Sequence, residues 1–171
     1  LQALLQYQYD RIDFIDEPVD VGFDCPLDLH CTYTRDQLLV ALDFLKPATV
    51  REGVKWLPEK QLDVFFVTLN KADKDYSINE SLFHWQSQST TAENSATGQR
   101  YIHHREKGNR VLLFVREFKA DARFGGAGAY TYLGTVNYVK HEGSRPMNIT
   151  WKLDRPIPAK FLKKTNKLVV G

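Results

Sequence analysis

Large aromatic rings lie unusually close to amides, acids and hydroxyls in residues 75–88. Aromatic faces stack on flat heterocycles, and each stacked nucleobase contributes about 1–3 kcal/mol. Carboxylate and amide oxygens accept hydrogen bonds from an exocyclic amine. Together they predict a pocket for a planar ring, such as a nucleic-acid base. The expected pocket residues are Tyr76, Asn79, Glu80, Phe83 and Trp85.

The second half of this stretch is predicted to be a strand, in which alternate side chains face opposite sides. Phe83 and Trp85 therefore share one face, and either ring is also a candidate core residue. The polar residues that follow are hard to place in a core, because buried amides and hydroxyls need hydrogen-bond partners. We therefore expect contacts to DNA from His84, Gln86, Ser87 and Gln88.

Charge is distributed unevenly along the 171 residues, although the formal net charge is only +2. Residues 1–50 contain nine acidic and three basic side chains, whereas residues 51–171 contain 12 acidic and 20 basic ones. This asymmetry is expected of a nucleic-acid-facing domain tethered to an acidic connector. Uneven surface charge without a partner is the alternative. The expected phosphate contacts are Arg100, Arg110, Lys163 and Lys164.

These side chains must be positioned by strands. The runs 62–69 and 111–118 are rich in β-branched and aromatic residues and predict central strands. Between them, residues 97–107 predict a short helix capped by Thr97 and ended by Gly108. An α+β fold is therefore predicted, built on a closed or nearly closed, curved β-barrel. Further strands are expected at 130–140, at 148–153 and around 168.

The acidic first part has its own signals. Thr34 and Gln37 form a capping box, which predicts a helix of about a dozen residues ended by Pro47. We predict two units, an acidic connector with this helix at 1–50 and the barrel at 51–171. The start at Leu1 suggests a piece of a longer chain.

Two cysteines, Cys25 and Cys31, are too few for a disulfide framework and too widely spaced for a CxxC knuckle. We expect reduced thiols in a cytoplasmic protein, with no metal and no cofactor. The paired histidines His103 and His104 are expected at the surface or at a helix cap. No run of about 20 apolar residues predicts a membrane span.

Several motifs resemble one family, the C-terminal domain of bacterial helicase-like ATPases that often carry an N-terminal phospholipase-D-type nuclease. Members of that kind include ATP-dependent type IV restriction enzymes of the SauUSI type. The resemblance covers almost the whole chain, because the motifs around residues 26–35 are similar to the helical connector of that family. The other motifs are Leu-Phe-His-Trp-Gln-Ser-Gln-Ser (82–89), Gly-Gln-Arg-Tyr-Ile (98–102), Leu-Leu-Phe-Val-Arg-Glu (112–117), Tyr-Leu-Gly (132–134) and Trp-Lys-Leu (151–153).

The resemblance implies a non-catalytic, SRA/PUA-like target-recognition domain that reads 5-methylcytosine or 5-hydroxymethylcytosine in double-stranded DNA. Its other partners would be the helicase and nuclease domains of the parent chain, with no membrane. SRA domains flip the base into a pocket, and stacking between Tyr76 and Trp85 would offset the few kcal/mol that flipping costs. The Tyr-Thr-Gly-rich pocket motif of SRA domains is missing, which leaves the reader of the cytosine edge open among Glu80, Asp75 and Asn79.

Two other functions are compatible with the residues. A PD-(D/E)xK nuclease holds Mg²⁺ with an aspartate and a Glu-x-Lys strand, for which Glu117 and Lys119 are candidates. Its upstream acid would be Asp63, Asp75 or Glu80. The third possibility is a protein module that docks on a helicase motor, for which the acidic connector is suited.

Overall fold

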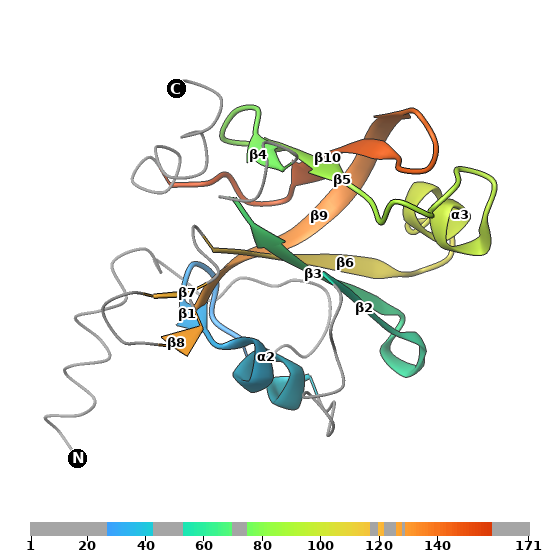
Figure 1. The fold of residues 1–171 in the computed structure, drawn as a ribbon. Coiled ribbons are helices and arrows are strands. Elements are labelled where there is room, and N and C mark those ends of the chain that lie inside the picture. The colour runs from blue at the N-terminus through green and yellow to red at the C-terminus, as the bar shows by residue number, and fades with distance from the viewer. Residues whose placement is uncertain are drawn as a thin grey trace, which may run out of the picture.

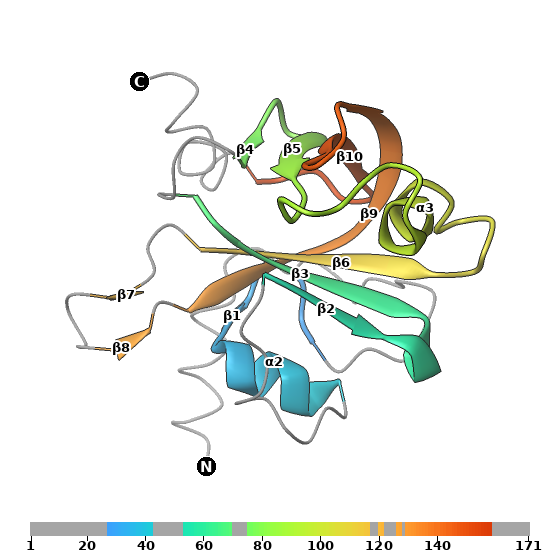
Figure 2. The same ribbon diagram turned by 45° about the vertical axis from the view of Figure 1, so that its right-hand side comes forward.

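A computed structural model shows a mixed eight-stranded sheet with two α-helices in the described part of the chain (Figures 1 and 2). The sheet has the order β2-β3-β6-β9-β10-β5-β4, and β1 pairs with β9 outside this path. The described residues are 27–42, 53–69, 75–116, 120–121, 126–127 and 129–158. The elements are β1 (Thr32–Tyr33), α2 (Arg35–Ala41), β2 (Val54–Leu57), the 3₁₀ turn η2 (Pro58–Lys60), β3 (Leu62–Thr68), β4 (Tyr76–Ser77), β5 (Leu82–Gln86), α3 (Ala96–Ile102), β6 (Arg110–Arg116), β7 (Ala120–Asp121), β8 (Gly126–Ala127), β9 (Tyr130–Glu142) and β10 (Asn148–Leu153).

Strand β9 is 13 residues long and takes part in both halves of the sheet. Its first half pairs with β6 and its second half with β10. Gly134 has a φ of +89° beside a register shift, and a positive φ is readily adopted only by glycine. The strand curves upward between the two halves in Figure 1. We call β4, β5, β10 and residues 136–142 the wing.

The central strands β3 and β6 pair in parallel, as two all-buried strands do when both faces of a sheet are covered. One face packs against α2 and β1 through a helix-side core that includes Val64 and Leu112. The other face packs against the wing and α3 through a wing-side core that includes Phe65 and Leu113. The predicted central strands are confirmed over the residues that are described.

The capping box of α2 is also confirmed. Thr34 Oγ1 accepts a hydrogen bond from the Gln37 backbone N–H, and Gln37 Oε1 accepts one from the Thr34 N–H. Leu38 and Leu39 are fully buried in the helix-side core. Helix α2 therefore shares a core with strands beyond residue 50, and the division predicted there stays a prediction. Pro47 lies outside the described residues.

Helix α3 is capped two residues earlier than predicted and ends at Ile102 rather than near residue 107. Ser95, rather than Thr97, is the N-cap, and its Oγ accepts a hydrogen bond from the Gly98 N–H at 3.0 Å. A Cβ on Gly98 would lie 2.2 Å from the carbonyl oxygen of Ala92, so only glycine fits. Turns follow the helix and reach Gly108, which has a φ of +71°.

The predicted closed barrel is not confirmed. Strands β2 and β4 are the two ends of the strand order, and no ladder joins them within the described ranges. The wing instead curls over one face of the central strands, with α3 beside it (Figure 2). None of the described helices has the length and apolar character needed to cross a bilayer.

Candidate nucleic-acid interface

The two predicted pocket rings of β5 point into the wing-side core. Phe83 is 0% exposed and Trp85 is 4% exposed. The Trp85 ring stacks on Phe65 with 4.2 Å between centroids and meets Tyr101 edge-on. Neither Phe83 nor Trp85 offers an open face to a base in this conformation, so the geometry favours the alternative that both are core residues.

The other pocket residues lie on the opposite side of the hairpin, which we call the outer face of the wing. Tyr76 stacks on His84 with 4.7 Å between ring centroids and 13° between planes. Gln86 lies further along β5 and donates a hydrogen bond to Asn148 Oδ1 on β10. These side chains are half-buried, and Lys152 of β10 faces the same side. The structure therefore brings Tyr76, His84 and Gln86 together without Trp85.

The turn between β4 and β5 contains Asn79 and Glu80. Asn79 Oδ1 accepts hydrogen bonds from the backbone N–H groups of Ser81 and Leu82, at 2.8 and 2.9 Å, so this oxygen stabilises the turn. Glu80 is exposed. Both residues border an open depression of about 650 Å³ together with Lys152. Glu80 is thus the predicted acceptor that remains accessible at this face.

Ser87 and Gln88 are held by hydrogen bonds within the protein, and the contacts to DNA expected of them stay a prediction. Ser87 is 7% exposed, and its Oγ accepts a hydrogen bond from the Met147 N–H. Gln88 Oε1 accepts hydrogen bonds from the hydroxyls of Tyr101 and Thr91, both at 3.2 Å. The polar residues that follow Trp85 were hard to explain as buried from the sequence alone. Their hydrogen bonds to Met147, Tyr101 and Thr91 explain how they can be buried.

The loop before α3 is joined to the end of strand β9 by a chain of hydrogen bonds that the sequence did not indicate. His141 Nε2 lies 2.8 Å from Glu93 Oε2, and His141 Nδ1 lies 2.6 Å from the Tyr138 hydroxyl. Burial and then the charge of Glu93 raise the pKa of Tyr138. This chain of hydrogen bonds fixes the loop before α3 against the end of strand β9.

Arg100 forms a buried ion pair rather than an exposed phosphate contact. Its Nε and Nη2 donate to both oxygens of Asp63, at 2.8 and 2.9 Å, and the Asp63 side chain is 0% exposed. The guanidinium also lies 4.5 Å from the centre of the Trp56 ring. Burial raises the pKa of Asp63, whereas the bonds from Arg100 lower it. Two of the five Arg100 N–H donors are therefore held by Asp63.

The same ion pair bears on the nuclease alternative. Asp63, one of its three candidate acids, is bound to Arg100 and is not placed to hold a metal. Glu117 and Lys119 lie outside the described residues. Within the ranges that are described, no group of three potential metal ligands is found. Lys163 and Lys164 also lie outside the described residues, and Arg110 is half-buried beside a second depression.

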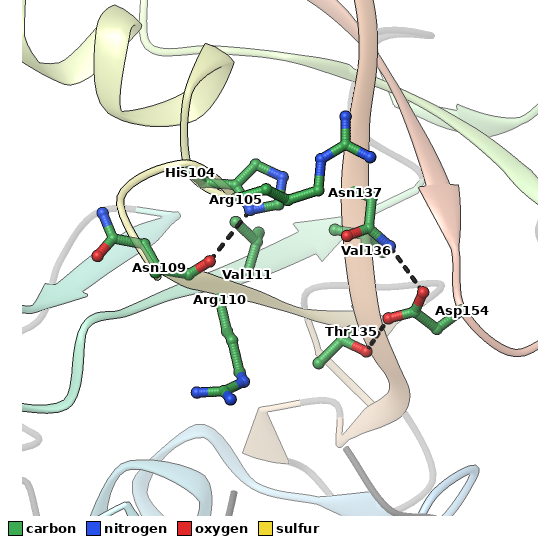
Figure 3. A pocket seen from close by; sticks show the side chains of 10 residues that line it. His104, Arg105, Asn109, Arg110, Val111, Thr135, Val136, Asn137 and Asp154 are labelled. Carbon is green, nitrogen blue, oxygen red and sulfur yellow. Dashed lines mark hydrogen bonds between the residues drawn. The ribbon is translucent and has the colours of Figure 1, made fainter. Parts of the chain in front are cut away.

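That second depression, of about 250 Å³, lies between the turns that follow α3 and strand β9 (Figure 3). Asp154, just beyond β10, accepts hydrogen bonds there from Thr135 Oγ1 and from Asn137 Nδ2. Arg105 also borders this depression and donates one hydrogen bond to the Tyr138 carbonyl. Thr135, Asn137 and Asp154 were not predicted as site residues, because they meet only in the folded chain.

His103 and His104 were expected at the surface or at a helix cap, and His103 is the C-cap of α3. His104 lines this depression and is only 2% exposed, so it does not lie at the surface. Its Nε2 accepts a hydrogen bond from the Tyr138 N–H, and its Nδ1 lies 3.2 Å from the Asn109 carbonyl oxygen. A backbone N–H only donates and a carbonyl only accepts, so the ring is neutral with its proton on Nδ1. Burial is the main cause that lowers the pKa of His104.

The lowered pKa of His104 predicts that the free energy of unfolding depends on pH. Because the folded pKa of His104 lies below the ordinary 6.5, the unfolded chain binds a proton that the folded chain does not. The contribution to stability is present above pH 6.5 and is lost as the pH falls, by at most about 1.4 kcal/mol per pH unit. Urea unfolding between pH 7.5 and 5.5 measures this slope. His104→Gln should reduce it, and the control His103→Gln, at a site with a 40% exposed side chain, should not.

Comparison with known families gives a direct match. Residues 27–164 match the family described as "Domain of unknown function (DUF3427)". The chain belongs to this family. No curated protein matches the sequence.

Several solved structures resemble this DUF3427 domain over part of their length. The crystal structure of KRYPTONITE in complex with mCHH DNA, H3(1-15) peptide and SAH matches with a TM-score of 0.51 and 12% identity, over 92% of this chain and 38% of that one. The modification-dependent restriction endonuclease AspBHI has a TM-score of 0.46 and 10% identity, over 81% and 46% of the two chains. The DNA recognition domain of the cytosine modification-dependent restriction endonuclease LpnPI has a TM-score of 0.37 and 9% identity, over 60% and 59%. At 12% identity, the likeness to the KRYPTONITE structure shows a shared fold and nothing about function. The TM-scores of the AspBHI and LpnPI structures are too low to show even the fold.

Proposed function

We propose that this DUF3427 domain is a non-catalytic DNA-recognition module that reads 5-methylcytosine or 5-hydroxymethylcytosine in double-stranded DNA. The observation that supports it best is the outer face of the wing, where the stacked rings of Tyr76 and His84 lie near Glu80 and Lys152. The fold is shared with a chain that was crystallised with mCHH DNA. The sequence motifs that resemble SRA-like recognition domains support the same class of ligand.

The chemistry follows from these side chains. The cytosine leaves the duplex and stacks on Tyr76, which His84 holds in place from its other side. Stacking contributes about 1–3 kcal/mol toward the few kcal/mol that flipping costs. The Glu80 carboxylate accepts a hydrogen bond from the exocyclic amine, and Lys152 neutralises a phosphate. This assignment replaces Trp85 by His84 as the second ring of the site.

The wider context is part of the proposal. We place the domain in an ATP-dependent type IV restriction enzyme of the cytoplasm, with the helicase-like motor and the nuclease in other parts of the parent chain. This assignment rests on the motifs around residues 82–89 and 112–117, which resemble those of the SauUSI-type proteins. The domain would select the modified site, and the other domains would perform the ATP-driven step and the cut.

Tyr76→Ala should weaken binding to a modified duplex by about tenfold, since one stacking face is lost. Binding is measured by fluorescence anisotropy on duplexes that differ only in one cytosine, 5-methylcytosine or 5-hydroxymethylcytosine. The matched control is Val40→Ala, which truncates a 52% exposed side chain on α2. Equal affinity of the unaltered chain for all three duplexes would sink the claim of modification reading.

A further inference from the structure

The depression in Figure 3 is separate from the outer face of the wing where Tyr76 stacks on His84, but it lies next to that face. Asn137 of β9 is the cross-strand partner of Lys152, which borders the larger depression at the β4–β5 turn. The two depressions therefore lie on neighbouring strands of the wing. A volume of about 250 Å³ is below the roughly 300–1,000 Å³ typical of drug-sized ligands. This depression suits a single planar ring better than a peptide or a whole nucleotide.

One wall of the depression accepts hydrogen bonds. Each oxygen of the Asp154 carboxylate receives one hydrogen bond, from Thr135 or from Asn137, and the Asp154 N–H is held by the Thr135 carbonyl at 3.1 Å. A carboxylate offers about four acceptor positions, so each oxygen can still accept another bond. The two side-chain contacts, drawn as dashed lines in Figure 3, orient the carboxylate without using its full capacity. No ion pair to Asp154 is found among the described residues.

Arg105, which also borders the depression, can donate hydrogen bonds. It is exposed and uses one N–H on the Tyr138 carbonyl, so among the described residues most of its five N–H donors remain for a ligand. His104 also lines the depression, and both of its ring nitrogens are already bonded. A fitting ring must therefore present two adjacent donors to Asp154 and an acceptor edge to Arg105.

Among the natural bases, guanine has this pattern. Its N1–H and N2–H₂ groups are adjacent donors that match the two oxygens of a carboxylate, and its O6 and N7 are the acceptors that arginine binds. Adenine and cytosine place an unprotonated ring nitrogen beside the amine, and thymine flanks its single N–H with two carbonyls. Each of these would turn a lone pair toward Asp154 and be disfavoured.

We infer that the depression formed by Arg105, Asn137 and Asp154 binds an unpaired guanine ring. Asp154 accepts from the N1 and N2 hydrogens, Asn137 and Thr135 orient that carboxylate, and Arg105 donates to the other edge. The guanine belongs either to a DNA strand or to a free guanine nucleotide. The DNA source rests on the proposed function, whereas the nucleotide source does not.

The test uses the full 171-residue chain and single-base changes in the ligand. A labelled single-stranded oligonucleotide with one guanine is compared with its inosine form, which lacks the 2-amino group, and with its 7-deazaguanine form, which lacks the N7 acceptor. Guanosine monophosphate and inosine monophosphate compete for the site in a second arm. Guanine is expected to bind about tenfold more tightly than inosine.

The variants assign this preference to the site. Asp154→Asn should abolish the preference over inosine, and Arg105→Gln should abolish the preference over 7-deazaguanine. Lys107→Gln removes the same charge two residues away and should change neither ratio. Should Asp154→Asn fail to fold, the exposed Arg105→Gln change still tests the assignment.

The outcomes separate the sources and the two proposals. A preference in both arms indicates a nucleotide site, and a preference in the oligonucleotide arm alone indicates a DNA base. Absence of any guanine preference, or a preference that survives in Asp154→Asn and Arg105→Gln, would overturn the inference. Equal binding of cytosine and its modified forms, with the guanine preference intact, would overturn the proposed function and leave this inference standing.

Discussion

Trp85→Ala is expected to lower the free energy of unfolding by about 3–5 kcal/mol, as truncation of a large core ring does. Trp85 is 4% exposed, stacks on Phe65 and meets Tyr101 and Trp151 edge-on, so its loss leaves a cavity among three rings. Chemical denaturation of the purified chain measures the change. A loss of this size is a large share of the stability of an ordinary domain.

Two comparisons make the Trp85 result decisive. Trp85→Phe keeps most of the contact with Phe65 and should cost far less, while Val40→Ala, at an exposed site on α2, should cost almost nothing. Suppose the Trp85→Ala chain keeps the free energy of unfolding of the unaltered chain but no longer distinguishes modified from unmodified duplexes. That result would contradict the core assignment. That outcome would return Trp85 to the base-contacting role that the sequence left open.

Arg100→Met should also cost about 3–5 kcal/mol, because it leaves a buried carboxylate without its partner. The Asp63 side chain is fully buried and Arg100 binds both of its oxygens, so water cannot reach the carboxylate to replace the lost hydrogen bonds. Burial favours the neutral acid, which raises the pKa of Asp63 further once Arg100 is gone. The variant should therefore regain part of its stability as the pH falls, which a denaturation series at several pH values detects.

The double change Asp63→Ala with Arg100→Met should recover much of the loss, since a buried ion pair replaced by apolar groups is often close to neutral. Lys107→Met, which removes an exposed charge on the turns after α3, is the control and should leave stability nearly unchanged. Normal stability of Arg100→Met, with affinity lowered equally for every duplex, would instead identify Arg100 as a phosphate contact.

Local patterns were sufficient for much of the secondary structure. The apolar runs that became β3 and β6 and the capping box at Thr34 depend on neighbouring residues in the chain, so they are visible in the sequence. The N-cap of α3 was misplaced by two residues, because serine and threonine both cap helices and the sequence offers Ser95 and Thr97 close together. The open sheet could not be anticipated, since closure depends on long-range pairing that no local pattern specifies.

The candidate site was predicted only in part, for a similar reason. Alternation along β5 correctly separated the face of His84 and Gln86 from that of Phe83 and Trp85. It could not show that Gln88 meets Tyr101 or that Arg100 meets Asp63, 37 residues away. Asp154 was missed because a lone aspartate after a strand gives no signal until Thr135 and Asn137 lie beside it.

The continuity of β9 has a mechanical consequence. Its first residues pair with β1, next to α2, and its last residues pair with β10 of the wing. Among the described residues, a rotation of the wing about β9 would break hydrogen bonds in the ladders that join β9 to β10 and to β6, so we find no hinge there. A torque applied where Tyr76 and Lys152 lie would be transmitted along β9 to β1 and α2 as a change in strand twist. Gly134 lies on β9 between these two pairings, where the register with β6 shifts.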